Sequence, residues 1–310
     1  MVVDMTAVDG MVIVAGSINV DLIVGVARLP TAGETVLGDR FIQQNGGKSA
    51  NQAVAASRVG ATVVMLGAVG GDDLGRSALE GLASEGVDVS SCRRLADEHT
   101  GLALIVVDAV GENQIAVAQG ANMCLDAAMI RGQTAELRPA PGAVCLLGFE
   151  VPDDAVLAAA RWAVGQGLRL IVNPAPARPL LDELLTLAPI LTPNESEAEL
   201  LTGSADPEAA AGILSAWTGA PVIVSLGAEG AMLSSGGQAT RLPATKVTPV
   251  DTTGAGDALN GILAAELARG APLEAALRWA MVGAALKTTR AGAQTGLPSR
   301  AAIAAHLAGC

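Results

Sequence analysis

The chain has 310 residues, of which 51% are hydrophobic and 16% are charged. This composition supplies the core of a large α/β domain and excludes a coiled coil or a disordered chain. The 19 Lys and Arg residues against 31 Asp and Glu residues give a net charge of -12, which repels polyanions, so we expect no nucleic-acid partner.

Continuous apolar runs alternate with alanine-rich helical stretches along most of the chain. Such runs are typical of strands that helices cover on both faces. The expected strands are 12–15, 62–67, 143–147, 170–172, 190–192 and 221–225, and the expected helices are 51–59, 74–85, 153–165, 209–217, 254–269, 273–288 and 299–307. This order predicts an α/β fold with a doubly wound, mostly parallel sheet in a single domain over residues 1–310.

Two segments interrupt this rhythm. Residues 19–44 hold two apolar runs separated by Pro30 and Gly33, and residues 100–118 hold two more around a turn-rich stretch. Both predict inserted strands that form a small β-sheet, either a lid or a dimer surface, and two surface hairpins are the alternative. The apolar strands would suit a homodimer that pairs through the lid.

Targeting and redox signals are weak. The first basic residue is Arg28, so the N-terminal apolar run lacks the basic flank of a signal peptide. Gly219 and Pro221 interrupt the longest uncharged stretch, 209–228, which predicts a cytoplasmic protein without a membrane span. The cysteines Cys92, Cys124, Cys145 and Cys310 form no C-x-x-C pair. We therefore expect neither a zinc site nor a disulfide framework.

The segment 251–257, Asp-Thr-Thr-Gly-Ala-Gly-Asp, leads directly into an apolar helix. Gly254 and Gly256 let the backbone approach a ligand, and free N–H groups at a helix N-terminus favour a polyphosphate there. Asp257 beside such an anion hole can orient and deprotonate an attacking hydroxyl, as phosphoryl transfer to an alcohol requires. An ordinary helix cap is the alternative.

The segment 44–51 is a second glycine turn that enters a helix. It lacks the first glycine of a Walker P-loop, and no G-x-G-x-x-G motif follows the first strand, so both of these nucleotide sites are disfavoured. Lys48 and Asn51 offer hydrogen-bond donors suited to sugar hydroxyls. A glycine turn with a surface lysine is the alternative.

Further polar residues follow expected strands, where open α/β sheets bind ligands. Asn19 and Asp21 share one face of an extended segment and suit the hydroxyls of a sugar, although a solvent-facing pair fits the spacing equally well. Asn194 and Glu197 suit hydrated Mg²⁺ and phosphate oxygens, with a capping box as the alternative. The glycine turn 225–230 is a weak signal by itself.

Taken together, these residues resemble the ribokinase branch of the PfkB carbohydrate kinase family. The similarity runs nearly end to end, through residues 16–21, 30–35, 46–53, 111–113, 120–122, 173–177, 192–195 and 251–257. It implies a doubly wound sheet with a small β lid and ATP-dependent phosphorylation of a primary hydroxyl, in this branch the 5-hydroxyl of D-ribose. The implied cofactors are ATP, Mg²⁺ and K⁺.

The resemblance also implies roles for individual residues. Asp257 would be the general base, and the anion hole would consist of Gly254, Ala255 and Gly256. The sugar would be held by Asn19, Asp21, Gly46, Gly47, Lys48, Asn51 and Glu150. The nucleotide and Mg²⁺ would be served by Asn194, Glu197, Ser225, Leu226, Gly227, Ala228, Glu229, Gly230, Gly256 and, near the adenine, Met281. A K⁺ ion would contact Asp251, Thr253 and backbone groups of Lys287, Arg290, Gly292 and Gly296.

Three positions depart from the family pattern. Ser49 replaces a glycine and adds a side chain near the sugar pocket, Gly296 stands where a serine often completes the cation site, and Met281 stands where Asn or His is frequent. The alternatives are therefore a kinase for deoxyribose, fructose or a nucleoside, and a non-catalytic sugar-binding protein on this fold. A nicotinamide dehydrogenase is disfavoured because the dinucleotide fingerprint is missing.

Overall fold

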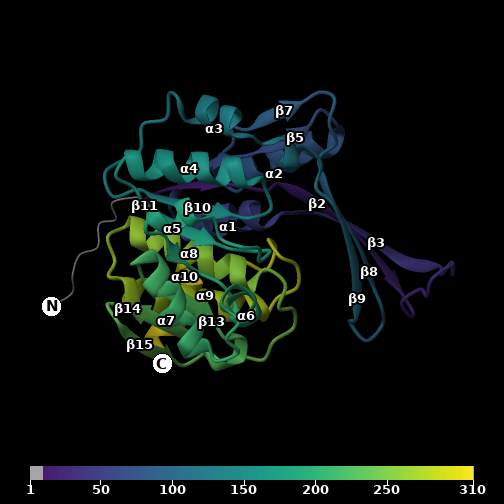
Figure 1. The fold of residues 1–310 in the computed structure, drawn as a ribbon. Coiled ribbons are helices and arrows are strands. Elements are labelled where there is room, and N and C mark those ends of the chain that lie inside the picture. Colours follow the sequence, from purple (N-terminus) through teal and green to yellow (C-terminus); the bar gives the residue numbers. More distant parts are fainter. Residues whose placement is uncertain (1–9, 310) are drawn as a thin grey trace.

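A central sheet lies between two layers of helices, and a second sheet projects from one side of the body (Figure 1). The structure is a computed structural model that describes residues 10–309. The central sheet has the strand order β15(Gln238–Leu242), β14(Ala231–Ser235), β13(Val222–Ser225), β12(Ile190–Leu191), β11(Arg169–Asn173), β10(Val144–Gly148), β1(Met11–Ala15), β4(Thr62–Leu66) and β6(Val87–Asp88). It is parallel from β13 to β6, and β14 and β15 are antiparallel.

Alternate strand residues bury into two separate cores because successive side chains point to opposite faces. Val12 and Val14 join a core with the helices α1(Lys48–Arg58), α2(Asp73–Ser84), α8(Ala255–Ala268), α9(Leu273–Thr288) and α10(Arg300–Ala308). Ile13 and Ala15 join the core on the opposite face, with α3(Ala127–Thr134), α4(Asp153–Gly165), α5(Asp182–Thr186), α6(Glu195–Thr202) and α7(Pro207–Thr218). The predicted doubly wound, mostly parallel sheet is confirmed.

The second sheet is built from the two segments that interrupt the main rhythm. Its order is β3(Gly38–Gly46), β2(Asn19–Val26), β8(Gly101–Val107) and β9(Asn113–Ala118). β2 pairs in parallel with β8, and each of these strands has an antiparallel partner on its other side. The 19–44 and 100–118 insertions therefore form one sheet rather than two unrelated hairpins, and we call this sheet the lid.

Several elements differ from the sequence prediction. Helix α1 begins three residues before the expected start, since Gly47 is its N-cap. Strands β14 and β15 were not predicted, and the turn 227–230 before β14 is too short for the crossover helix that a parallel strand requires. Also missed were α3, α5, β6 and the small sheet of β5(Ala68–Gly70) and β7(Arg93–Leu95). Helices α4 and α9 match their predicted bounds.

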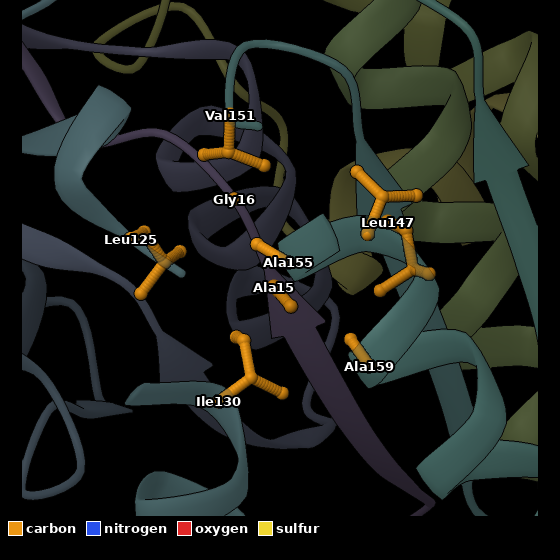
Figure 2. Close-up of a pocket in the computed structure, with 9 residues that line it drawn as sticks. Ala15, Gly16, Leu125, Ile130, Leu147, Val151, Ala155 and Ala159 are labelled. Atoms are coloured by element: carbon orange, nitrogen blue, oxygen red, sulfur yellow. The ribbon is translucent and has the colours of Figure 1, made fainter. Parts of the chain in front are cut away.

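Figure 2 shows a gap between the end of β1 and helix α4, with Ala15, Leu125, Ile130 and Ala155 around it. Its lining is apolar, and it is too narrow for a water molecule, so it is a packing defect rather than a ligand site. Cys92, Cys124 and Cys145 are free thiols, and Cys310 lies outside the described residues. None of the helices in residues 10–309 is both long and apolar enough to cross a bilayer.

Candidate active site

A cavity of about 160 Å³ lies at the carboxyl ends of β11, β12 and β13, where they face the N-terminus of α8. Parallel strands place their carboxyl ends at one edge of the sheet, so polar residues that are distant in the sequence converge there. The lining includes side chains or backbone of Lys48, Asn173, Thr192, Asn194, Glu197, Ser225, Gly254, Ala255, Gly256, Asp257 and Asn260. Eight predicted site residues thus share one cavity with Asn173, Thr192 and Asn260, which were not assigned a role.

Asp257 lies in the first turn of α8 and is only 7% exposed. Its Oδ2 accepts a hydrogen bond from Asn51 Nδ2 at 2.9 Å, and its Oδ1 accepts one from Gln52 Nε2 at 3.2 Å. Burial raises the pKa of Asp257, while the charge of Lys48 and the two amides oppose that rise. The carboxylate is thus held in one orientation and binds a proton more readily than an exposed aspartate.

An amide network supports this carboxylate. Gln52 Nε2 also donates to Asn173 Oδ1 at 3.0 Å, and Asn173 Nδ2 donates to the backbone oxygen of Thr192 at 3.0 Å. The Thr192 hydroxyl donates to Asn260 Oδ1, and Asn260 Nδ2 donates to the Gly256 oxygen at 2.9 Å. The signal that could have found Gln52, Asn173 and Asn260 is polarity inside otherwise apolar elements, because a buried amide needs partners.

The start of α8 lies on the cavity, where the sequence predicts an anion cradle. Gly254 is its N-cap, with φ of 77°, a conformation that favours glycine. The first N–H groups of a helix have no acceptor within it. Ala255 N already donates to the Thr252 oxygen at 3.1 Å, so the N–H groups of Gly256 and Asp257 are the ones available to an anion. A side chain at Gly256 would meet nothing within 4 Å. The cradle is therefore open on the cavity side.

A second carboxylate group lies at the base of the lid. Burial raises the pKa of Asp21 to about 6, with further contributions from the negative charges of Glu150 and Asp257. Gly46 lies against Asp21 so closely that a Cβ there would be 2.4 Å from its carboxylate. Glu150 Oε2 accepts hydrogen bonds from the Ser17 hydroxyl and from Lys48 N at 3.0 Å. Three acidic side chains thus face the region between the lid and α8.

Asn19 is fixed by a residue that the sequence analysis left without a role. Asn122 Nδ2 donates to Asn19 Oδ1 at 2.7 Å, and Asn122 also exchanges hydrogen bonds with the backbone of Ile18. A Cβ at Gly47 would lie 2.8 Å from the backbone nitrogen of Asn19. The hydrogen bonds of Asn122 and the absence of a side chain at Gly47 therefore fix the position of the chain where it passes from β1 to the lid strand β2.

Ser49 lies in a buried space between two strand ends. Its side chain is fully buried, and its hydroxyl lies against the backbone of Gly16 and Gly148, close enough to clash with a Cβ at either position. Within residues 10–309 this hydroxyl has no hydrogen-bond partner. Ser49 therefore fills a space between two strand ends that Gly16 and Gly148 leave open.

Asn194 and Glu197 form a complete capping box. Asn194 Oδ1 accepts from Glu197 N, and Glu197 Oε2 accepts from Asn194 N, both at 2.8 Å. Both residues also line the cavity. Burial raises the pKa of Glu197, whereas the Asn194 N–H and the charge of Lys48 lower it. The capping box that the sequence offers as the alternative is therefore present, and both side chains also line the cavity.

The turn 225–230 and Met281, which the resemblance assigns to the nucleotide, lie mostly outside this cavity. Ser225 lines the cavity, but Leu226 is 8% exposed and packs into the core. Gly227, Ala228 and Glu229 form an exposed turn, and Gly230 packs against the backbone of Leu242. Met281 also lies in a core and not on the cavity lining, because a long apolar side chain on α9 is better buried than exposed.

The residues expected around K⁺ enclose a lysine side chain. Asp251 Oδ1 accepts from Thr253 N at 2.9 Å, and its Oδ2 accepts from Gly292 N at 2.7 Å. Lys287 is 0% exposed, and its Nζ donates to the Asp251 backbone oxygen at 2.9 Å. Every oxygen of Asp251 thus has a donor, and a positive charge is already present. These residues do not fit a free K⁺ ion, and Lys287 contributes its side chain rather than a backbone ligand.

Comparison with known proteins gives a consistent result. Residues 9–300 match the model of the pfkB family carbohydrate kinases. A ribokinase of Haemophilus influenzae is 38% identical over 292 residues, which cover 93% of this chain and 95% of that protein. The ribokinase of Thermotoga maritima superposes with a TM-score of 0.88 at 31% identity, over 96% of this chain and 99% of that one. An Arabidopsis thaliana ribokinase complexed with ribose and ATP gives 0.85 at 29% identity, over 96% and 98%.

Proposed function

The chain belongs to the pfkB family of carbohydrate kinases, and on that premise we propose that it is a ribokinase, which transfers the γ-phosphoryl group of ATP to the 5-hydroxyl of D-ribose. The observation that carries this proposal is the Asp257 carboxylate, buried and held by two amides beside the open helix N-terminus of α8. A general base and an anion cradle within one helical turn are what phosphoryl transfer to an alcohol needs.

In this proposal Asp257 accepts the proton of the sugar hydroxyl as its oxygen attacks the γ-phosphorus. The N–H groups at the start of α8 stabilise the negative charge that develops on the phosphoryl oxygens. Lys48, which lines the same cavity, adds a positive charge close enough to influence both Asp257 and Glu197. The leaving group is ADP, so the products are ribose 5-phosphate and ADP.

We assign Asn194, Glu197 and Ser225 to the phosphate side of the nucleotide. Mg²⁺ is usually bound through one or two carboxylates together with substrate phosphates and water. Among the described residues no group of three or more His, Cys, Asp and Glu side chains is arranged to hold a metal, whereas Glu197 presents a single carboxylate to the cavity. When bound with ATP, Mg²⁺ would neutralise phosphate charge.

Asp21, Asn19, Gly46, Gly47, Asn51 and Glu150 form the sugar side. Asp21 lies on the face of the lid that also carries Ile23, because residues two apart share a face of a strand. Ile42, Ile23, Ile105 and Ile115 pair directly across the four strands and continue this face. The lid would therefore cover a bound sugar with apolar side chains and exclude water that would otherwise hydrolyse ATP.

The opposite face of the lid supports a homodimer. Phe41 and Leu104 lie on that face and are 63% and 50% exposed. Large apolar side chains that stay exposed on a projecting sheet are typical of an interface, and we propose a second copy of this chain as the partner. We propose a cytoplasmic enzyme, because ATP is its substrate, and a single kinase domain with an inserted lid.

The test is a coupled assay of ADP release with Mg²⁺ across ribose, deoxyribose, fructose and several nucleosides. We expect turnover with ribose well above the rest. A strong preference for another compound would keep the kinase reaction and replace the sugar. No turnover with any of them would contradict the proposed function and favour a sugar-binding protein on this fold.

A further inference from the structure

A buried ammonium group, that of Lys287 near the end of α9, lies against the loop that precedes the anion cradle. On the basis of the proposed kinase function, we propose that the side chain of Lys287 is a built-in monovalent cation that holds this loop in its active form, so that the enzyme needs no K⁺. Lys287 is therefore a positioning residue, since it acts on the reaction through the loop.

The path of the side chain supports this inference. A Cβ placed on Gly296 would lie 3.1 Å from Lys287 Cε, 2.9 Å from the Gly292 oxygen and 3.0 Å from the Arg290 oxygen. The lysine side chain therefore runs close to these backbone carbonyl groups, and its Nζ donates to the Asp251 oxygen at 2.9 Å. Nζ also lies 3.6 Å from Asp251 Oδ2. Carbonyl and carboxylate oxygens around a buried positive charge are the environment that a desolvated monovalent cation requires.

Charge balance argues against a second cation at this place. The ammonium already pairs with Asp251, and the Asp251 carboxylate also accepts the N–H groups of Thr253 and Gly292. A K⁺ ion among the same oxygens would lie close to the ammonium group, and like charges at short range in a buried site repel strongly. One positive charge therefore satisfies this loop.

Two sequence features that are 9 positions apart complement each other in space. Lys287 supplies the long side chain, and Gly296 leaves room for it, because any Cβ at Gly296 would contact Cε and two carbonyl oxygens at 3.1 Å or less. The glycine that deprives a free ion of a serine ligand thus makes space for the lysine. Lys287 and Gly296, the two departures from the expected cation site, are therefore consistent with a single change in which the ammonium group takes the place of a free ion.

The loop connects the ammonium group to the anion cradle. The N–H groups of Val250 and Asp251 donate to the Thr288 oxygen at the end of α9. Ala293, in the loop that follows α9, lies 3.2 Å from the Cβ position of Gly254, the N-cap of α8. A shift of Asp251 would therefore displace Gly254 and the N–H groups that face the phosphate, and small displacements in such a cradle can cost about 10²-fold in rate.

The first experiment compares wild-type turnover in K⁺ with turnover in tetramethylammonium at equal ionic strength. We expect the two rates to agree within about twofold, since the internal cation leaves no demand for an external one. A severalfold activation of the wild-type enzyme by K⁺ would overturn the inference.

Two variants separate charge from packing. Lys287→Met keeps the length of the side chain and removes the charge, and we expect kcat to fall by about 10²-fold with the KM for ribose nearly unchanged. Lys287→Ala opens space for an ion, so that K⁺, but not tetramethylammonium, should raise both its rate and its melting temperature. A folded Lys287→Met with wild-type kcat, or a folded Lys287→Ala that does not respond to K⁺, would overturn the inference.

The melting temperature keeps this test independent of the proposed function. If no sugar is phosphorylated under any condition, the kinase proposal fails, and the K⁺ titration still decides the inference. Wild-type protein whose melting temperature is unchanged by K⁺, together with stabilisation of Lys287→Ala, supports a built-in cation. Stabilisation of the wild-type protein by K⁺, together with no effect of K⁺ on Lys287→Ala, contradicts it. Should Lys287→Ala fail to fold, the wild-type comparison and Lys287→Met remain decisive.

Discussion

The N-terminus of α8 and the lid differ in which side chains they bury and which they expose. Around Asp257 the polar side chains are buried and bonded to one another, through Asn51, Gln52, Asn173 and Asn260. On the lid, large apolar side chains such as Phe41 are exposed on a sheet that projects from the body (Figure 1).

The difference shows which part of the site is complete without ligands. At α8 the Asp257 carboxylate already accepts hydrogen bonds from Asn51 and Gln52 before any substrate arrives, while N–H groups at the helix start stay open to an anion, so the geometry is preorganised for chemistry. The lid retains exposed apolar surface that a sugar and a second copy of the chain would cover. Asp21 stands at the junction of the two regions, and its raised pKa follows from burial next to Glu150 and Asp257.

Asp257→Asn is expected to have the largest effect on turnover, and it tests whether the α8 region carries the chemistry. If the α8 region carries the chemistry, kcat should fall by roughly 10² to 10⁴-fold, the usual contribution of a positioned base. ADP release under saturating ribose and ATP measures the loss.

Asp73→Asn is the matched control, because Asp73 is also an aspartate in the first turn of a helix but is exposed on α2. Its kcat should remain unchanged. An Asp257→Asn enzyme that is folded and fully active would remove Asp257 from the mechanism.

Asp21→Asn tests the junction. A hydrogen bond to a charged acceptor contributes about 1.5–3 kcal/mol, so kcat/KM for ribose should fall by roughly 10 to 10²-fold while the KM for ATP stays constant. Steady-state kinetics with both substrates measure this. Asp39→Asn, at the start of β3 on the exposed lid, is the control, and equal effects of the two variants would argue against a sugar contact at Asp21.

The same variant should stabilise the protein. The pKa of Asp21 rises from 3.8 to about 6 on folding, so above pH 6 the wild-type protein carries the cost of an ionised, half-buried carboxylate. After allowance for solvent screening, Asp21→Asn should raise the free energy of unfolding by about 1–2 kcal/mol at pH 8.

This gain should shrink as pH falls from 6 to 4, because the folded-state carboxyl becomes protonated there while the unfolded one stays largely ionised. Urea unfolding at pH 8, 6 and 4 gives the measurement. A difference that does not depend on pH would show that the effect does not come from the charge of Asp21.

The smallest expected effect on rate concerns the outer face of the lid. Phe41→Glu with Leu104→Lys should convert a dimer to a monomer in sedimentation velocity, while kcat at saturating substrate changes by less than about threefold, since neither side chain faces the site. Val110→Lys is the matched control, because Val110 lies in a turn and its side chain is 83% exposed. A wild-type monomer would contradict the proposed homodimer.

Much of this architecture could be predicted before the structure was seen. Continuous apolar runs identified the central strands, and the glycine segment before α8 located Asp257 at a helix start, because both signals are local to the chain. The strands β14 and β15 were missed. The short turn 227–230 allows β14 to pair with β13 only in the antiparallel direction, and the sequence pattern did not show this. The side chains of Met281 and Leu226, which the resemblance assigns to the nucleotide, are packed in the two cores, which the local sequence did not show.

The sequence by itself determined the order of the elements and the residue types at each strand end, because backbone periodicity and glycine spacing are properties of neighbouring residues. Only the tertiary structure decided where three side chains lie: Ser49 between Gly16 and Gly148, Asn122 against Asn19, and Lys287 against Asp251. Each pairing joins residues at least 33 positions apart. Such contacts depend on how the elements pack, which no local pattern records.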